Sequence, residues 1–572
     1  MRLPQLFLLL LLISADLSLF GQQSYPVDYF ISPVNIPISL SGSFAELRAN
    51  HFHSGIDIKT GGEEGLPVFA SANGFISRIK VSSAGYGKAI YIDHPNGYTT
   101  VYAHLQKFNP KIEQWVKSEQ YRLQKSEADF FPEKGLLAVE KGDTLAFSGN
   151  SGSSEGPHLH FEIRDTKTEK PIDPLLFGLP VNDYVRPVIE SLRIFPEDSS
   201  ATISGHRLPY RPDIAGWGPV YRLKKNDPIE IAGKFSLGLL VYDYQNDKVH
   251  KNGVSQFEVY LDSALVFQWK ATSFAFSETR YINSFIDYAA YKTSGERTMR
   301  TRVDPNNRLS LYTTAVSKGI FYVQPDSVSS FKLVVKDSYL NESVIRFEIK
   351  GARPVSSVAR PKPAHPVFSH QKDNVFEKDG FRLTVPGKCI YDDFEFSFSV
   401  SDKKSTTLSP VYAVHNPLTP LHDYAVIEVT VDPKYRIHGP KLLLARLQKG
   451  RKPVFAGGQY NNGSLKALVR EFGEYALMAD TTAPEIIPEE GGDRIPVSDS
   501  HMISFTIRDD LSGIRDYSAT LNNQWIVLEY DAKSNRLTYV FDHLLLAGEN
   551  SMKVMVEDQC GNTATYSTLL IN

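Results

Sequence analysis

The sequence has little cysteine and no strong charge imbalance. Only Cys389 and Cys560 occur among 572 residues, which excludes a disulfide framework and leaves open whether these two pair. The formal net charge is −3, so there is no electrostatic reason to expect binding to nucleic acid or to an anionic membrane surface. The fold must therefore depend on apolar cores rather than on a set of disulfide bonds.

Long apolar runs are also missing, except at the N-terminus. There, Arg2 precedes the apolar stretch Leu6–Ile13, and Gly21 suits cleavage before Gln22. This pattern predicts a signal peptide over residues 1–21, too short to span a bilayer comfortably; an uncleaved anchor is the alternative. No later segment reaches transmembrane length. We expect an exported chain with no transmembrane anchor after cleavage, located in the periplasm, at the cell envelope surface or outside the cell.

What is abundant is aromatic and β-forming sequence. The chain contains 29 Tyr and 33 Phe, and its hydrophobic content of 42% is that of a folded protein. A single core cannot serve 572 residues, so three to five domains are expected. The predicted fold class is mainly β.

The most informative stretch is SGNSGSSEGPHLHFEIR, residues 148–164. It reads as a Gly/Ser loop followed by a strand, in which successive side chains point to opposite faces. The polar face carries His158, His160 and Glu162. The apolar face carries Leu159, Phe161 and Ile163, and fits a core. Alone, the two imidazoles fit either a metal centre or a solvated strand face.

Two further segments offer polar side chains. His53 and Asp57 lie four residues apart in a Gly-rich region that favours loop and strand. Asn96-Gly97 predicts a tight hairpin, whose second arm would place Thr100, Tyr102 and His104 on one face. Each of these signals is weak by itself.

The order of the motifs is more specific than any one of them. The chain carries, in order, His53-x3-Asp57, Gly65-Leu66-Pro67-Val68, Gly85-Tyr86-Gly87, Tyr102-Ala103-His104-Leu105, Gly142-Asp143, Ser148–Gly152 and Gly156–Glu162. This set resembles the lysostaphin-type zinc metallopeptidases, whose fold is a β-rich duplicated hybrid motif. The resemblance covers roughly residues 40–180.

The resemblance implies a function for five side chains. His53, Asp57 and His160 correspond to the family's zinc ligands, and His104 and His158 to its two non-ligand catalytic histidines. Three protein ligands leave the fourth position of tetrahedral zinc to water, which zinc acidifies. That water would attack a peptide carbonyl while the two histidines stabilise the oxyanion and move protons. His51 is a competing ligand, but the family spacing selects His53.

Two other hydrolase templates fit less well. Residues 152–156 match G-x-S-x-G, but Pro157 and a strand follow where the serine-hydrolase motif needs a helix. Ser154 is therefore predicted to lie in a loop. The zinc-protease motif H-E-x-x-H is absent.

The segment between His104 and Gly142 is longer than the family pattern requires, because it contains an insert at residues 110–131. Pro110 suits the first turn of a helix, and the positions that follow give a mostly apolar face at helical spacing: Ile112, Trp115, Val116, Glu119 and Leu123. We interpret the insert as a helix packed on the side of the domain; a wall or lid over the substrate groove is the alternative.

The remaining chain contains an internal repeat. Lys332–Asn341 matches Lys553–Asn562 at identical spacing, and Val241–Asp243 parallels Ile507–Asp509. We predict immunoglobulin-like β-sandwiches at 186–350, with an insertion near 264–330, and at 483–572. Between them lie a Pro-rich linker at 351–367 and a third β module at 368–480, without a recognised signature; the peptidase-like domain takes 25–183.

The sequence therefore predicts an exported zinc endopeptidase that cuts peptide bonds in peptidoglycan stem peptides or cross-links. The chemistry follows from the predicted site, and the substrate from the family resemblance. Two alternatives stay open: a non-catalytic scaffold that binds zinc or the cell wall, and a peptidase for exogenous proteins. The β modules could bind cell-surface or protein partners.

Overall fold

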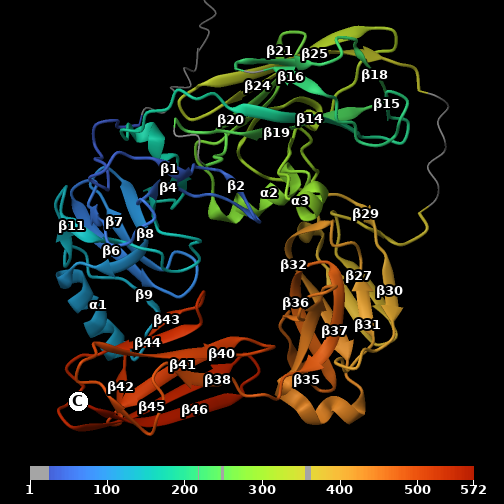
Figure 1. The fold of residues 1–572 in the computed structure, drawn as a ribbon. Helices are drawn as coiled ribbons and strands as arrows, with labels where there is room; N and C mark the ends of the chain where they lie inside the picture. The colour runs from blue at the N-terminus through green and yellow to red at the C-terminus, as the bar shows by residue number, and fades with distance from the viewer. Residues whose placement is uncertain (1–24, 217, 247–249, 355–362) are drawn as a thin grey trace, which may run out of the picture.

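Strands dominate the computed structural model, which describes residues 25–216, 218–246, 250–354 and 363–572. The predicted leader and part of the predicted linker lie outside these residues. The expected mainly β fold is confirmed. Four β-rich parts follow one another around a ring, and the last returns to the first (Figure 1).

The N-terminal domain is built on an eleven-stranded sheet, whose central path is β1-β4-β12-β8-β7-β6-β10. Its strands are β1 Leu40–Gly42, β4 Ile56–Lys59, β5 Pro67–Phe69, β6 Gly74–Val81, β7 Lys88–Asp93, β8 Tyr98–Phe108, β9 Ala128–Phe130, β10 Ala138–Val139, β11 Thr144–Ser148, β12 His158–Asp165 and β13 Pro171–Ile172. The short pair β2 Leu47–Arg48 and β3 His51–Phe52 stands apart from the sheet, and η1 Pro174–Phe177 follows it.

The apolar face of β12 forms part of this domain's core. Leu159, Phe161 and Ile163 are fully buried there, as the alternation predicts. The opposite face of the same strand is therefore free to carry polar side chains. Because β12 pairs with β4 on one side and β8 on the other, residues from three neighbouring strands meet on that face.

The predicted helix in the insert is present as α1, Pro110–Leu123. Asn109 caps its N-terminus by accepting a hydrogen bond from the Ile112 amide at 2.8 Å. Ile112 and Val116 are buried against the domain, whereas Leu123 is 40% exposed. The helix packs on the side of the domain.

The first module contains a three-stranded and a nine-stranded sheet around one core. The three strands are β14 Val188–Pro196, β19 Phe235–Tyr242 and β22 Met299–Arg300. The nine are β15 Thr202–Ile203, β16 Ile214–Gly216, β17 Val220–Leu223, β18 Ile229–Ala232, β20 Gln256–Leu261, β21 Ala264–Lys270, β23 Tyr312–Ala315, β24 Val328–Lys336 and β25 Glu342–Gly351. The helical segments are η2 Phe276–Tyr281, α2 Ile282–Phe285, α3 Tyr288–Ser294 and η3 Val316–Gly319.

The N-terminal domain and the first module share packing. Phe44 and Phe52 come from the N-terminal domain but are buried in the core of the first module, beside Phe274. His53 directly follows Phe52, so the first module helps to fix the chain where the predicted site begins.

The second module has two five-stranded sheets and a two-stranded pair. One sheet holds β27 Asn374–Lys378, β28 Phe381–Val385, β32 Pro420–Thr430, β35 Gln459–Asn461 and β36 Ser464–Glu471. The other holds β30 Phe398–Ser401, β31 Val411–Val414, β33 Leu442–Leu447, β34 Val454–Phe455 and β37 Gly473–Ala479. The pair is β26 Val367–Phe368 and β29 Phe394–Glu395, and the helical turns are η4 Gly387–Cys389 and η5 Pro433–Lys441.

The third module packs a four-stranded sheet on a five-stranded one. The four are β38 Glu485–Pro488, β40 Met502–Arg508, β43 Glu529–Asp531 and β44 Arg536–Val540. The five are β39 Arg494–Pro496, β41 Ile514–Leu521, β42 Gln524–Ile526, β45 Glu549–Asp558 and β46 Thr563–Ile571.

Contacts between the third module and the N-terminal domain close the ring (Figure 1). The Tyr121 hydroxyl at the end of α1 donates to Asp542, and the Tyr517 hydroxyl donates to Glu127 at 2.6 Å. Lys533 donates to the backbone oxygen of Asn150, in the Gly/Ser loop before β12. The predicted insert thus also docks a distant module, a role that its own sequence did not indicate.

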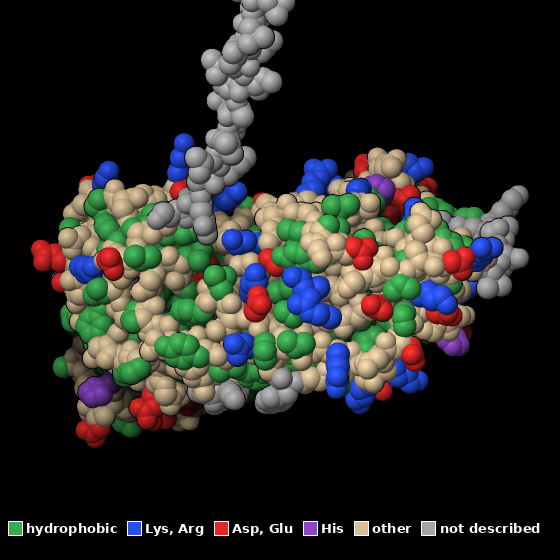
Figure 2. Space-filling model, turned by 90° about the horizontal axis from the view of Figure 1, so that it is seen from above, with side chains coloured by type: hydrophobic (Ala, Val, Ile, Leu, Met, Phe, Trp, Pro, Cys, Tyr) green, Lys and Arg blue, Asp and Glu red, His purple; other side chains and the backbone are tan. Residues whose placement is uncertain are grey.

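Cys389 and Cys560 are both free and buried, in different modules, so they do not pair. None of the helices in the described part of the chain is long and apolar enough to cross a membrane. On the face shown in Figure 2, basic and acidic side chains are interspersed.

Candidate metal centre and active site

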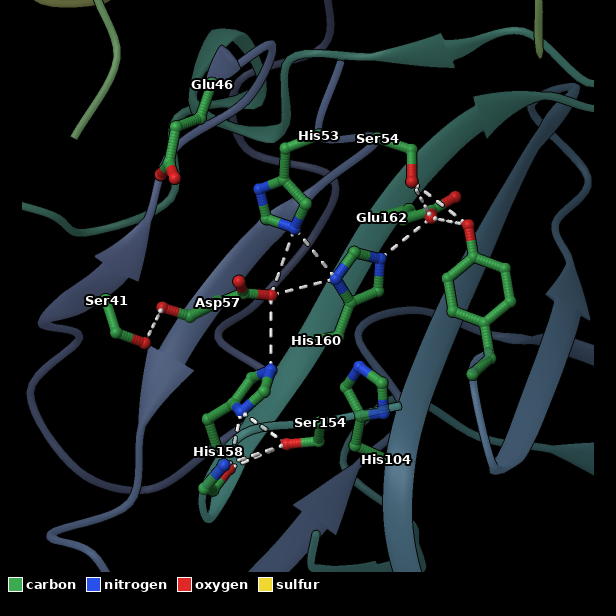
Figure 3. Close-up of polar contacts among 12 residues, drawn as sticks. Ser41, Glu46, His53, Ser54, Asp57, His104, Ser154, His158, His160 and Glu162 are labelled. Carbon is green, nitrogen blue, oxygen red and sulfur yellow. Dashed lines mark hydrogen bonds and ion pairs between the residues drawn. The ribbon is translucent and has the colours of Figure 1, made fainter. Parts of the chain in front are cut away.

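Three predicted side chains meet at one point of the N-terminal domain (Figure 3). His160 Nδ1 lies 2.8 Å from Asp57 Oδ1 and 3.0 Å from His53 Nε2, and His53 Nε2 lies 3.1 Å from Asp57 Oδ1. The sheet sets this geometry, because Asp57 on β4 and His160 on β12 are direct cross-strand partners. The three residues are 2–4% exposed.

Hydrogen bonds fix which nitrogen of each ring faces this point. His53 Nδ1 lies 2.8 Å from the Ser43 carbonyl oxygen, and His160 Nε2 lies 2.8 Å from Glu162 Oε1. Carbonyl and carboxylate oxygens only accept, so these nitrogens carry the ring proton. The other two nitrogens, His53 Nε2 and His160 Nδ1, lie 3.0 Å apart beside Asp57 Oδ1, where a metal ion could take the place of a proton.

Glu162 holds His160 in place and is itself held by three donors. The Ser54 hydroxyl and the Tyr86 hydroxyl each donate to Glu162 Oε1 at 2.6 Å, and Arg164 Nε donates to Glu162 Oε2 at 2.6 Å. A carboxylate behind a metal-binding histidine fixes the orientation of the ring and raises its basicity. The alternation placed Glu162 on the right face, but the sequence did not assign this role.

Arg48 anchors the second oxygen of Asp57. Its Nη2 donates to Asp57 Oδ2 at 2.5 Å, which leaves Oδ1 to face the two histidines. Gly42 makes room for this pair, since a Cβ there would lie 2.4 Å from Arg48 Nη2 and 2.6 Å from Asp57 Oδ2. The sequence reasoning missed Arg48, because the β2–β3 pair that brings it to the site was not foreseen.

His104 reaches the site through an irregularity in β8. Its φ is +58°, and the register of β7 against β8 shifts between Lys88 and Ile90. The expectation that His104 shares a face with Tyr102 is wrong. The Tyr102 ring packs on Phe161 in the core, whereas the His104 ring lies 5.8 Å from that of His160, on the other face of β12. The bulge turns the side chain around, as bulges beside active sites often do.

His104 and His158 lie side by side next to the three converging residues, with ring centres 4.8 Å apart. His104 Nδ1 donates to the Ser151 carbonyl oxygen at 2.9 Å, and His158 Nδ1 donates to the Gly156 carbonyl oxygen at 2.8 Å. Both rings therefore leave Nε2 as the basic nitrogen. His158 Nε2 lies 3.4 Å from Asp57 Oδ1.

Ser154 lies in the loop before β12 and supports His158 rather than forming a nucleophile elbow. Its hydroxyl donates to the Gly156 carbonyl oxygen at 2.7 Å and lies 3.2 Å from His158 Nδ1. His51 does not join the site, because it is exposed and its Nδ1 lies 2.8 Å from the Ala49 carbonyl oxygen.

The environment separates the proton affinities of the histidines. Burial lowers the pKa of His53 to about 4. Burial and then the charges of His160 and His158 lower the pKa of His104 to about 3. Although burial disfavours a charged ring, hydrogen bonds to Asp57 and Glu162 raise the pKa of His160 to about 9. Burial also opposes ionisation of Asp57, but the three histidines hold its pKa well below the usual value.

The domain that carries this site is similar in sequence to known proteins. Residues 51–121 match the sequence profile of peptidase family M23. The N-terminal domain is a peptidase M23 domain. The predicted resemblance of this M23 domain to lysostaphin-type peptidases is thereby confirmed. Residues 365–480 match the profile of a Zu5-like domain, which supplies the signature that the sequence of the second module did not reveal.

Relatives of the M23 domain carry peptidase names. The chain is 35% identical over 140 residues to the DD-carboxypeptidase/endopeptidase Mpg of Neisseria meningitidis, covering 24% of this chain and 26% of that protein. It is 31% identical over 130 residues to the peptidoglycan DD-endopeptidase ShyB of Vibrio cholerae, covering 23% of this chain and 24% of that protein. The similarity thus spans about a quarter of each relative.

Among solved structures, a peptidase domain also matches part of the chain. The catalytic domain of lysostaphin from Staphylococcus simulans is 23% identical, with 24% of this chain and 88% of that chain covered and a TM-score of 0.18.

The M23 domain fits zinc by the chemistry of its ligands. Two imidazole nitrogens and one carboxylate oxygen are ligands that zinc accepts, and three protein ligands are typical of catalytic sites. His53 and His160 each donate the N–H of the other ring nitrogen to an oxygen, as metal-binding histidines do.

Proposed function

We propose that the chain is an exported zinc metalloendopeptidase that hydrolyses peptide bonds in peptidoglycan stem peptides or cross-links. The observation that carries the proposal is the convergence of His53 Nε2, Asp57 Oδ1 and His160 Nδ1 within 3.1 Å, with both rings oriented by hydrogen bonds on their far side. Bound there, zinc would supply an acidified water and polarise the peptide carbonyl.

His104 and His158 would handle the protons. Each presents a basic Nε2, because its Nδ1 donates to a backbone carbonyl. One accepts a proton from the attacking water, and that proton passes to the leaving amine as the C–N bond breaks. A protonated ring can also donate a hydrogen bond to the oxyanion. Residual exposure of the His158 side chain, 15%, leaves an approach from that side.

The substrate class rests on the relatives, since two proteins at least 31% identical over this domain are named as peptidoglycan or DD-peptidases. The leader predicted from the sequence supports export to the compartment where such a substrate lies.

The test uses the purified mature chain and isolated sacculi. We expect stoichiometric zinc, release of new amino termini from sacculi, and loss of that release on chelation, with recovery when zinc is returned. A matched preparation of His160→Ala should neither contain zinc nor release amino termini. Binding to sacculi without release would favour a scaffold, and cleavage of denatured protein but not of sacculi would favour a peptidase for exogenous proteins.

A further inference from the structure

Three buried carboxylates meet where the M23 domain joins the first module. They are Asp183, in the connection after η1, Asp243, which directly follows β19, and Asp337, which directly follows β24. One oxygen from each lies within 4.8 Å of the others, and the residues are 6%, 4% and 2% exposed. Burying like charges together costs free energy unless something compensates them.

Asp243 is the least compensated of the three. Its Oδ1 is buried and has no hydrogen-bond partner. Two described lysines that adjoin the cluster in the sequence pair with other groups: Lys336 with Glu258 at 3.6 Å and Lys251 with Glu190 at 3.6 Å. Burial and then the charges of Asp337 and Asp183 raise the pKa of Asp243 well above its usual value. A buried carboxylate oxygen without a donor is unusual, and a bound cation would compensate it.

A second unpartnered oxygen belongs to the residue opposite. Asp243 and Asn252 exchange backbone hydrogen bonds of 2.9 and 2.8 Å, so their side chains emerge on the same side of the pair. Asn252 is 3% exposed, and its Oδ1 also lacks a hydrogen-bond partner. Asp243 and Asn252 thus each bury a side-chain oxygen that accepts no hydrogen bond from the described residues.

A tight turn holds the Asp337 carboxylate in position. Asp337 Oδ1 accepts from the backbone N–H groups of Tyr339 and Asn341 at 2.8 and 2.9 Å. Asn341 Nδ2 donates both to Asp337 Oδ2 at 2.7 Å and to the Asp183 carbonyl oxygen at 3.1 Å. The connection between the domains is therefore tied to the turn, and the Asp337 carboxylate is preorganised.

The internal repeat supplies a comparison within the same chain. In the third module, Asp480, Asp509 and Asp558 also have oxygens within 4.8 Å, and Asn562 bridges Asp558 and the Asp480 carbonyl in the same way. Here, however, backbone donors satisfy the carboxylates. Asp480 Oδ2 accepts from the Ser512 N–H at 3.1 Å and Asp509 Oδ2 from the Gly513 N–H at 2.7 Å. None of the three aspartates keeps a buried oxygen without a partner.

We propose that Asp183, Asp243 and Asp337, with the amide oxygen of Asn252, bind one Ca²⁺ at the junction of the M23 domain and the first module. The ligand set consists of oxygens alone, which selects a hard cation. Ca²⁺ accepts six to eight oxygens in irregular geometry, whereas Mg²⁺ requires a near-ideal octahedron. Because Asp183 lies in the connection, the ion would fix the two domains relative to each other.

Calcium titration of the zinc-loaded, calcium-depleted full mature chain tests the proposal. Isothermal titration and thermal unfolding are compared for wild type, Asp243→Asn and Asp509→Asn, the last being the matched control. We expect CaCl₂ to raise the Tm of wild type and of Asp509→Asn. We expect Asp243→Asn to lose one bound Ca²⁺ per chain and to show no rise in Tm.

Equal calcium binding by wild type and Asp243→Asn would overturn the proposal. So would a wild type that does not respond to CaCl₂ and becomes more stable on Asp243→Asn, since the cluster would then be neutral by protonation. A Tm rise with MgCl₂ as large as with CaCl₂ would contradict the choice of ion. If Asp243→Asn does not fold, Asp183→Asn takes its place, and the wild-type titration remains decisive.

Discussion

Asp57 and His160 stand directly opposite each other on the antiparallel strands β4 and β12, with Asp57 Oδ1 2.8 Å from His160 Nδ1. On the other side of β12, His160 pairs with Ala103, the neighbour of His104. The candidate ligands and catalytic groups are thus fixed by one sheet, and a site built on paired strands holds its geometry better than one built on loops.

Glu162→Gln should weaken zinc binding about 10–100-fold, because the charged partner of the His160 ring is lost while the shape is kept. Competition with a chromophoric chelator measures the change. Tyr86→Phe removes a single donor to Glu162 and is expected to have a smaller effect. If Glu162→Gln binds zinc like wild type, Glu162 does not position the ligand.

Arg48→Gln should also weaken zinc binding, by about 10–100-fold, the equivalent of a charged hydrogen bond of ~1.5–3 kcal/mol. The loss leaves Asp57 Oδ2 buried without its donor. Arg78→Gln is the matched control, since Arg78 pairs with Asp129 away from the site. Equal zinc affinities of the two variants would contradict the role given to Arg48.

Zinc affinity should rise with pH. The pKa of His160 is about 9 without metal, so below that pH zinc must displace one proton from the ring. His53, with a pKa of about 4, is already neutral above about pH 6 and adds nothing. The apparent association constant should therefore increase about tenfold per pH unit between about pH 6 and 8. A flat or falling profile in chelator competition would show that His160 is not a protonated ligand.

Much of this site could be predicted because it depends on local alternation. The alternation of side chains along a strand predicted His158 and His160 on one face and Phe161 in the core, and the structure confirms both placements. The same rule failed for His104, because a bulge adds one residue to β8 and reverses the side chain. No sequence pattern marks such a bulge.

The rest could not be predicted because it depends on contacts between distant segments. Arg48 reaches Asp57 through a two-stranded pair packed on the first module. The repeat was visible in the sequence, but Asp183 lies outside it, and only the fold brings that residue to Asp243 and Asp337.

Reducing agents should leave the Tm unchanged, because Cys389 and Cys560 are free and lie in different modules. Burial raises the pKa of each thiol to about 11, so neither should react with a thiol reagent at pH 8 until the protein is denatured. A fall in Tm on reduction would reveal a disulfide and contradict the fold.

Metal content and turnover, measured on the same preparations of His104→Ala, His158→Ala and His160→Ala, test the central claim most directly. The proposed function assigns zinc binding to His160, beside Asp57, and proton transfer to the other two, whose Nδ1 atoms face backbone carbonyls. We predict that the His104 and His158 variants keep stoichiometric zinc but release amino termini from sacculi at least about 100-fold more slowly. His160→Ala should lose both zinc and turnover. Turnover by His160→Ala, or loss of zinc from His104→Ala, would contradict this division of roles.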